Sequence, residues 1–406
     1  MKLATFFWKP ETGWSLDSFP PSNSRQTLVL AFGSSQLLDD PTPMVELREA
    51  YPDACLTGCS TAGEIFGSEL LDGTLAVVVA QFEGTSLQLA SEPLNPADGS
   101  FRAGAAVARH LSRADLRGIL IFADGLRANG SELLRGLNQV LYQDIPPGGD
   151  VSIPVAGGLA ADGDRFERTW TAVAGVPKSG WVTAVGFYGD RVRLGFGCQG
   201  GWTGFGPQRT VTRSRGNVLY ELDGKPALQL YQEYLGKLAW ELPTTALLLP
   251  LTLGAPHYHH PMVRTAIGVD RGTRSMIFTG DIPEGSVAQL MLGNAERLID
   301  GAIAAALIAR HNSRPPAERW DSRTGTSHKI QPDRPTLAIA IGGSGRRLVL
   351  GERTEEELEA TLDELPDQTQ QIGFYGYGEF APHGGAAVCR LQNQTLTLIA
   401  IQEASD

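Results

Sequence analysis

Two glutamates, each preceded by glycine, are the side chains of this chain best suited to bind a small molecule. Residues 56–66, with the sequence LTGCSTAGEIF, place Ser60, Thr61 and Glu64 among glycines between two apolar runs. Glu379 also follows a glycine, near the carboxyl end of the chain. Small polar groups at the end of a buried strand suit a concave binding site better than a core. The carboxylates could accept hydrogen bonds from an amino or guanidino group of the ligand.

A carboxylate on the same ligand would need a cationic partner, and Arg264 and Arg346 are the candidates, because a guanidinium binds a carboxylate through two parallel hydrogen bonds. Tyr375 lies in the glycine-rich run of the second glutamate and completes the set of candidate ligand-binding residues. These side chains predict a pocket for an amino acid or a similar zwitterion. Structural roles are the alternative: the acids could cap backbone amides, and the arginines could form ion pairs.

Three of the seven histidines fall in one short segment, residues 254–262, with the sequence GAPHYHHPM. If this segment is extended, His257 and His259 share one face and His260 lies on the other. A neutral imidazole beside apolar surface could bind haem iron or a divalent metal. No Cys-x-x-Cys-His attachment motif is present, and a solvated loop with ordinary histidines is the alternative interpretation. His383 is the next candidate for a ligand of this kind.

Nucleophilic catalysis is not indicated by the residues around the first motif. Cys59 and Ser60 are possible nucleophiles, but neither has an activating base nearby in the sequence. We therefore expect a binding protein and not an enzyme, with a hydrolase that uses one of these two residues as a competing hypothesis. The four cysteines are too few for a disulfide framework in a chain of this length, so buried free thiols are expected.

Composition bounds the class of protein. With 406 residues and 42% hydrophobic content, the chain can bury a large core and is expected to form two domains. The net charge of -11 and the lack of a Lys/Arg-rich block argue against nucleic acid or an anionic membrane as partner. No apolar run is long enough to span a bilayer, and the first ten residues do not form a secretory signal. A cytoplasmic location is therefore expected.

The order strand, helix, glycine-and-acid strand, strand occurs three times along the chain. Each copy starts with an apolar strand, at residues 27–32, 118–124 and 336–341. The acids Glu64, Asp164 (or Asp162) and Glu379 fall near the end of the third element of their copies. Such successions are also common in mixed sheets, so chance similarity is the alternative. The pattern predicts an α+β fold with mixed β-sheets, flanking helices and an internal repeat.

The helical signals divide the chain into two domains after a lead segment of residues 1–26. A helix expected at 226–235 has proline in its first turn and glycine after its end, which places the boundary near Leu222. The predicted domains are therefore residues 27–222 and 223–406. The longest expected helix covers 294–310, and the polar run 312–334 is expected to be an exposed loop.

Several of these segments resemble a known family. Residues 58–65, GCSTAGEI, resemble the signature of the amino-terminal FIST domain, and residues 346–351, 372–379 and 393–395 resemble features of the carboxy-terminal FIST domain. The resemblance extends over nearly the whole chain from Thr27. In the family a cysteine often precedes the Gly-Arg pair and a histidine often precedes Asn-Gln-Thr, and this chain has neither. If those side chains contact ligand in relatives, this protein binds a different ligand or binds it differently.

The resemblance implies a bacterial sensory input module that binds a small ligand. Such modules are found alone or joined to chemoreceptors, histidine kinases and cyclic-dinucleotide enzymes, and a subset is described as haem-bearing nitric oxide sensors that control a partner kinase. This chain has no recognisable kinase or cyclase segment, so a histidine kinase or cyclic-dinucleotide enzyme is expected to act in trans. The ligand is expected where the two domains approach one another. A haem-based gas sensor, a hydrolase and a scaffold without ligand are the alternatives.

Overall fold

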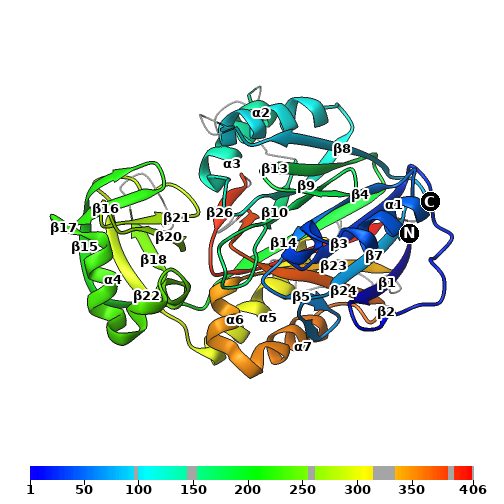
Figure 1. Ribbon diagram of the computed structural model, residues 1–406. Coiled ribbons are helices and arrows are strands. Elements are labelled where there is room, and N and C mark those ends of the chain that lie inside the picture. The colour runs from blue at the N-terminus through cyan, green and yellow to red at the C-terminus, as the bar shows by residue number, and fades with distance from the viewer. Residues whose placement is uncertain (96–98, 144–152, 255–260, 314–333, 383–387, 405–406) are drawn as a thin grey trace, which may run out of the picture.

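Three apolar segments form the central strands of three sheets in the computed structural model of the protein (Figure 1). They are β3 (Thr27–Gly33), β9 (Leu116–Ala123) and β23 (Thr336–Gly343), and nearly all their residues are buried. Strands that are apolar on both faces need cover on both faces, which stacking of the sheets and helices provides. The structure describes residues 1–95, 99–143, 153–254, 261–313, 334–382 and 388–404.

Each central strand has the same set of neighbours. A parallel strand lies on one side: β4 (Cys55–Ser60), β10 (Val155–Leu159) or β24 (Thr369–Gly376). An antiparallel strand lies on the other: β7 (Leu75–Gln81), β13 (Trp181–Tyr188) or β27 (Leu396–Glu403). Beyond it pairs β1 (Lys2–Lys9), β8 (Ser86–Pro93) or β14 (Val192–Gln199). The repeat predicted from the sequence is therefore confirmed, as is the α+β class.

The three units exchange short strands in a cycle. The first gives β5 (Glu64–Phe66) to β24 of the third unit, the third gives β25 (Gly378–Ala381) to β10 of the second, and the second gives β11 (Thr171–Val173) to β4 of the first. Each donated strand continues the sheet with β6 (Glu69–Leu71), β26 (Arg390–Gln392) or β12 (Val176–Lys178). No unit can therefore complete its sheet alone, and the two glutamates lie on strands that join neighbouring sheets.

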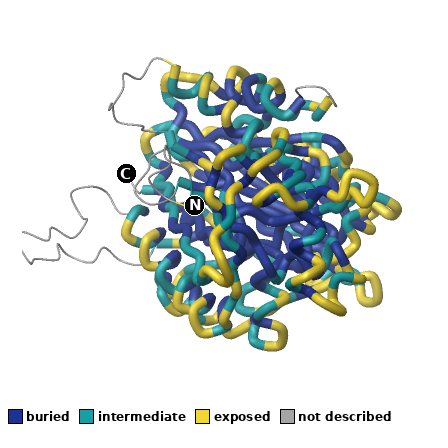
Figure 2. Tube along the Cα trace, turned by 90° about the vertical axis from the view of Figure 1, so that its left-hand side faces the viewer, coloured by how far each residue is buried: buried dark blue, intermediate teal, exposed yellow. Residues whose placement is uncertain are grey.

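Helices connect and cover the sheets. The link between the first and second strands of a unit contains α1 (Thr42–Ala50), α3 (Gly130–Leu141), or α6 (Ser344–Leu350) with α7 (Thr354–Asp363). In the second unit α2 (Gly99–Leu111) precedes the central strand, and α5 (Ala295–Asn312) does so in the third. Figure 2 shows the buried residues gathered on the sheets beneath a more exposed outer layer. The predicted long helix at 294–310 is confirmed as α5.

A smaller domain is inserted between β14 and α5 of the third unit, and lies to one side of the three sheets in Figure 1. Its sheet contains β15 (Thr203–Arg215), β16 (Val218–Leu222), β18 (Leu251–Gly254), β19 (Met262–Arg264), β20 (Ala266–Asp270), β21 (Ser275–Phe278) and β22 (Val287–Leu292). The predicted helix at 226–235 is α4 (Ala227–Leu235), which buries Leu228 and Tyr231 against this sheet. The predicted boundary at Leu222 falls inside the sheet, because β16 pairs with both β15 and β21.

Candidate functional site

A cavity of about 580 Å³ lies where the carboxyl ends of strands from all three units meet. Ser34 lines it after β3, Ser344 lines it after β23, and Leu247 of the 3₁₀ helix η3 (Thr244–Leu248) adds a wall from the smaller domain. Ligands commonly bind at the carboxyl ends of parallel strands in open sheets. The other lining residues are Gln36, Thr61, Ala62, Gly63, Glu64, Leu70, Asp72, Gly73, Asp162, Gly163, Asp164, Arg165, Arg347, Leu348 and Gly351.

Glu64 is a buried acid of this cavity, with only 1% of its surface exposed. The Thr61 hydroxyl donates to Oε1, and the backbone N–H and the hydroxyl of Thr74 donate to Oε2 at 3.1 and 2.7 Å. Burial raises the pKa of Glu64 to about 7, the hydrogen bonds oppose that rise, and the nearby charge of Asp72 adds to it. Glu64 can therefore gain or lose its proton near neutral pH.

Arg347 brings positive charge to the same cavity from α6. Its guanidinium donates to the carbonyl oxygen of Ala62 and pairs with Asp72, with Nη1 at 2.8 Å from Oδ1. The guanidinium lies against Gly63, where an added Cβ would be 2.6 Å from Nη1 and where φ is +133°. Arg165 lines the cavity as well and donates to Ser35 Oγ at 2.9 Å. The site thus combines buried acid with partly exposed arginine, as a zwitterion requires.

The acid that matches the glutamates in the second unit is Asp124, and not Asp162 or Asp164 as the sequence pattern suggested. Asp124 Oδ2 accepts the N–H of Gly180, the residue before β13, at 2.6 Å. Thr74 and Thr395 precede β7 and β27 and donate to the two glutamates in the same manner. The pattern misassigned the acid because the second unit carries it at the end of its central strand.

Asp162 instead folds the loop that carries Asp164 and Arg165. Its buried carboxylate accepts backbone N–H groups from Phe166, Glu167 and Arg168, and also the hydroxyl of Tyr377. Four donors to one carboxylate hold the loop in a fixed turn over the cavity. Asp164 lines the cavity on this loop.

Glu379 does not line this cavity, although its setting repeats that of Glu64. It is fully buried, and the N–H and hydroxyl of Thr395 donate to Oε2 at 3.2 and 2.7 Å. Oε1 has no hydrogen-bond partner. Burial raises the pKa of Glu379 to about 8, against the hydrogen bonds from Thr395 and the charge of Arg346. The structure therefore places Glu64 at the cavity and Glu379 away from it, whereas the sequence predicted both in one pocket.

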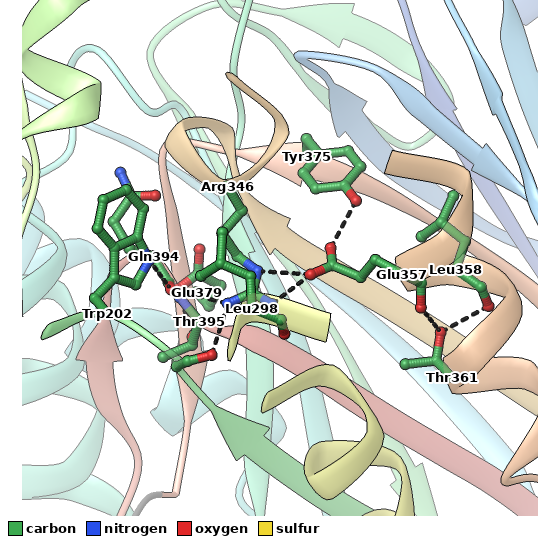
Figure 3. Close-up of polar contacts among 11 residues, drawn as sticks. Trp202, Leu298, Arg346, Glu357, Leu358, Thr361, Tyr375, Glu379, Gln394 and Thr395 are labelled. Carbon is green, nitrogen blue, oxygen red and sulfur yellow. Dashed lines mark hydrogen bonds and ion pairs between the residues drawn. The ribbon is translucent and has the colours of Figure 1, made fainter. Parts of the chain in front are cut away.

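The remaining candidate ligand-binding residues have structural partners. Arg346 is fully buried and pairs with Glu357 (Figure 3). It also donates to the carbonyl oxygens of Gly200 and Leu298 at 2.9 and 2.7 Å. Tyr375 donates its hydroxyl to the other oxygen of Glu357 at 2.8 Å. This is the ion-pair role that the sequence left open for the arginine.

Two further candidates also lie outside the lining of the cavity. Arg264 donates to the carbonyl oxygens of Asp281 and Leu391, which ties the smaller domain to β26. Ser60 is fully buried, and its Oγ accepts the N–H of Trp170 at 3.0 Å. Of the predicted set, the structure brings only Thr61 and Glu64 together at the cavity.

The histidines proposed as haem ligands, His257, His259 and His260, lie outside the described residues, as does His383. Over the part of the chain that the structure describes, no three His, Cys, Asp or Glu side chains cluster as metal ligands would. The cysteines are free, as predicted. Burial raises the pKa of the Cys59 thiol, which keeps it in the less reactive form.

Comparison with known proteins gives the family. Residues 27–225 match the FIST N domain and residues 227–382 match the FIST C domain. The chain belongs to the FIST family. FIST domains are associated with sensory signal transduction. The boundary between the two matched domains falls within the inserted smaller domain, so the FIST N and FIST C segments share the three-sheet body.

Individual relatives are distant. An uncharacterized protein of Methanocaldococcus jannaschii is 29% identical over 168 residues, which are 38% of this chain and 32% of that protein. This chain thus spans about a third of that relative. Cyanuric acid hydrolase from A. caulinodans aligns over 93% of this chain and 90% of its own at a TM-score of 0.36 and 9% identity. PurLQS from Thermotoga maritima aligns over 85% and 74% at a TM-score of 0.17 and 9% identity. None of the helices in the described ranges is long and apolar enough to cross a membrane.

The buried glutamates predict a pH dependence of stability. A carboxyl whose pKa is raised in the folded state binds its proton more tightly there, so its contribution to stability falls as pH rises from its ordinary pKa to the folded value. We expect Glu64→Gln to gain stability relative to the wild-type protein between pH 4.5 and about 7. The gain is up to about 1.4 kcal/mol per pH unit. Urea unfolding at several pH values measures it, and a constant difference would contradict the buried acid.

Proposed function

We propose that this FIST protein is a sensory input protein that binds an amino acid-like zwitterion in the cavity and regulates a partner signalling protein in trans. The observation that carries the proposal is the buried Glu64 carboxyl facing the same cavity as Arg347 and Arg165. The volume, about 580 Å³, suits a small molecule.

The proposed contacts follow from the charges. The ammonium group of the ligand binds ionised Glu64, whose oxygens are held in place by Thr61 and Thr74. The ligand carboxylate binds Arg347 or Arg165. Arg347 already pairs with Asp72, whose side chain is mostly exposed, so the ligand competes with a solvated partner and not with a buried one.

A ligand in the cavity could change the relative position of the segments that line it. Residues of the FIST N and FIST C segments line it, and the FIST C residues include Leu247 of the smaller domain. A ligand that contacts all of them favours the arrangement in which they approach most closely. A histidine kinase or a cyclic-dinucleotide enzyme that binds this arrangement would then respond to the ligand.

We also propose that the protein binds its ligand without converting it. Ser60 accepts a backbone hydrogen bond and Cys59 is a buried thiol of raised pKa, which disfavours the hydrolase hypothesis for these residues. The haem-based nitric oxide sensor remains the second candidate through His257, His259 and His260. A Soret band in the purified protein that is lost in a variant of one of these histidines would establish it.

Glu64→Gln is the direct test of the ligand site. We expect the variant to bind the best of the twenty amino acids about tenfold to a hundredfold more weakly by calorimetry, because it loses a hydrogen bond between charged groups. Wild-type affinity should rise as pH increases through about 7, since Glu64 ionises there, whereas the variant should lose this rise.

Glu379→Gln is the matched control, because Glu379 also accepts the N–H and the hydroxyl of a threonine, Thr395, but does not line the cavity. At pH 6 to 7, where Glu379 of the wild-type protein is protonated, this variant should bind the amino acid as the wild-type protein does. Equal affinity in the Glu64 variant, or a larger loss in the Glu379 variant, would refute the site.

A further inference from the structure

The tripeptide Asn393–Gln394–Thr395 is one of the places where the three-sheet body holds the smaller domain, beside the hydrogen bond from Arg264 to Leu391. The Thr279 hydroxyl donates to Asn393 Oδ1 at 2.8 Å, and Gln394 Nε2 donates to Thr265 Oγ1 at 3.0 Å. Both threonines belong to the smaller domain. Trp202, where the chain enters that domain, donates its indole N–H to the Gln394 carbonyl oxygen at 2.9 Å (Figure 3). We call this set of contacts between the tripeptide and the smaller domain the joint.

Glu379 holds the same tripeptide from the side of the three-sheet body. Its Oε2 accepts both the N–H and the hydroxyl of Thr395. Gln394, the preceding residue, has φ of +61°, which an L-residue with a side chain adopts only where its surroundings impose it. The hydrogen bonds to Glu379 hold Thr395, the residue that follows Gln394.

Two buried oxygens at this joint lack a donor. Glu379 Oε1 and Gln394 Oε1 both have no hydrogen-bond partner, and both residues are at most 1% exposed. The two residues flank Gly343, where an added Cβ would lie 2.9 Å from Glu379 Oε1 and 2.8 Å from Gln394 Cα. An ionised carboxylate would add negative charge at a place that lacks hydrogen-bond donors. A protonated carboxyl instead brings an O–H donor of its own.

The charged groups around Glu379 do not overcome its preference for the protonated form. Arg346 on α6 favours its ionised form and Glu357 on α7 opposes it, and these two already pair with one another. Cys198 on β14 lies near Glu379 as well, with a thiol of raised pKa. Burial outweighs the other influences and raises the pKa of Glu379 to about 8.

The joint also touches the wall of the ligand cavity. A Cβ added at Gly345 would collide with the carbonyl oxygen of Leu247, and would lie 2.5 Å from Gln394 Nε2. Leu247 lines the cavity. The smaller domain, the tripeptide and the cavity wall therefore meet at one glycine.

We propose that the protonated carboxyl of Glu379 fastens the smaller domain to the three-sheet body, and that ionisation of Glu379 loosens this joint. Loosening lets water reach the carboxylate, and it frees Leu247 to move at the cavity. The consequence for ligand binding rests on the proposed function, whereas the proton-dependent joint does not.

The sign of the effect follows from linkage. The closed joint binds the proton more tightly than an open joint in which Glu379 is hydrated. The equilibrium constant for opening of the joint therefore rises by up to about tenfold per pH unit between the ordinary pKa of a glutamate and the raised pKa of Glu379. Above the raised pKa the constant no longer changes with pH. The joint is firmest in mildly acidic solution.

Hydrogen exchange of the full-length protein, without ligand, tests the proposal. We expect protection of peptides covering residues 200–206, 262–281 and 391–396, corrected for intrinsic exchange, to fall up to about tenfold per unit between pH 5.5 and 7.5 and to level off above pH 8. Glu379→Gln, which keeps a neutral side chain of the same size, should show constant protection in these peptides.

Two further variants keep the test decisive. Glu64→Gln should retain the wild-type fall in protection, because it removes another buried glutamate of raised pKa without touching the joint. Thr395→Val keeps Glu379 but removes a hydroxyl that donates to its carboxylate, which should raise the pKa of Glu379 further. The fall in protection should therefore extend to higher pH. The proposal is overturned if the wild-type joint shows no fall, or if Glu379→Gln shows the same fall as the wild-type protein. Since no ligand is present, failure of the amino acid site would leave these outcomes unchanged.

Discussion

Replacement of Gly157 by alanine is expected to leave the chain without a stable native state. Gly157 lies on β10 with φ of +151°, and an added Cβ would be 1.7 Å from the carbonyl oxygen of Ile121 on the parallel strand β9. Relief of this overlap requires the two strands to separate, which breaks their shared hydrogen bonds. We expect a loss of about 4 kcal/mol or more, a large part of the stability of a typical domain. Urea unfolding followed by circular dichroism measures it.

The repeat supplies replicates of this experiment. Gly58 and Gly373 meet Ala31 and Ala340 in the same manner, so alanine at either position should be equally damaging. Gly254→Ala is the control, because the nearest atom to its added Cβ is a carbonyl oxygen at 3.9 Å. That variant should change stability by less than about 1 kcal/mol. Equal midpoints for the Gly157 and Gly254 variants would mean that close strand approach is not what requires glycine.

Arg346→Met is expected to destabilise the protein by about 3–5 kcal/mol, because it leaves the buried charge of Glu357 without its partner. It also leaves the carbonyl oxygens of Gly200 and Leu298 without the donors that hold α5 and the segment after β14 against α6. The hydroxyl of Tyr375 alone cannot replace these interactions. The measurement is the free energy of unfolding from urea titration, with the tyrosine and tryptophan signals followed together.

Arg353→Met is the comparison, since Arg353 pairs with Glu356 and Glu296 at the surface and should leave the urea midpoint almost unchanged. A double variant, Arg346→Met with Glu357→Gln, removes the uncompensated charge and should recover part of the loss. A single Arg346 variant as stable as the Arg353 variant would show that the buried pair does not hold the third unit together.

The repeat could be predicted from the sequence because its signals are local. Apolar runs mark the central strands, and turn residues and helical periodicity mark the links between them. The cyclic exchange could not be predicted. The donated strands are short, as β5 with its residues Glu64–Phe66 shows. A segment of this length carries no signal for whether it pairs with its own sheet or with a neighbouring one.

Two of the predicted ligand-binding residues line the cavity that forms the candidate site. The motif around Thr61 and Glu64 lies at the cavity, but Arg347 was missed in favour of Arg346. Consecutive residues of a helix point about 100° apart. On α6 this rotation sends Arg346 to Glu357 in the interior and Arg347 to the cavity. Asp72 was missed as well, because a surface turn with an acidic residue carries no sign of an arginine far away in the sequence.

The strands and helices, their threefold order, the glycines of the middle strands and the family could all be predicted from the amino-acid sequence. Which buried glutamate lines the cavity, and which lies beside the smaller domain, depends on how the sheets and helices pack. Glu64 and Glu379 both follow a glycine. Each accepts the N–H and the hydroxyl of a threonine, which is Thr74 for Glu64 and Thr395 for Glu379. Their difference lies in residues distant along the chain, Asp72 and Arg347 for one and Arg346 and Gln394 for the other. Burial and charge act through space, so two similar local motifs acquire different roles when the chain folds.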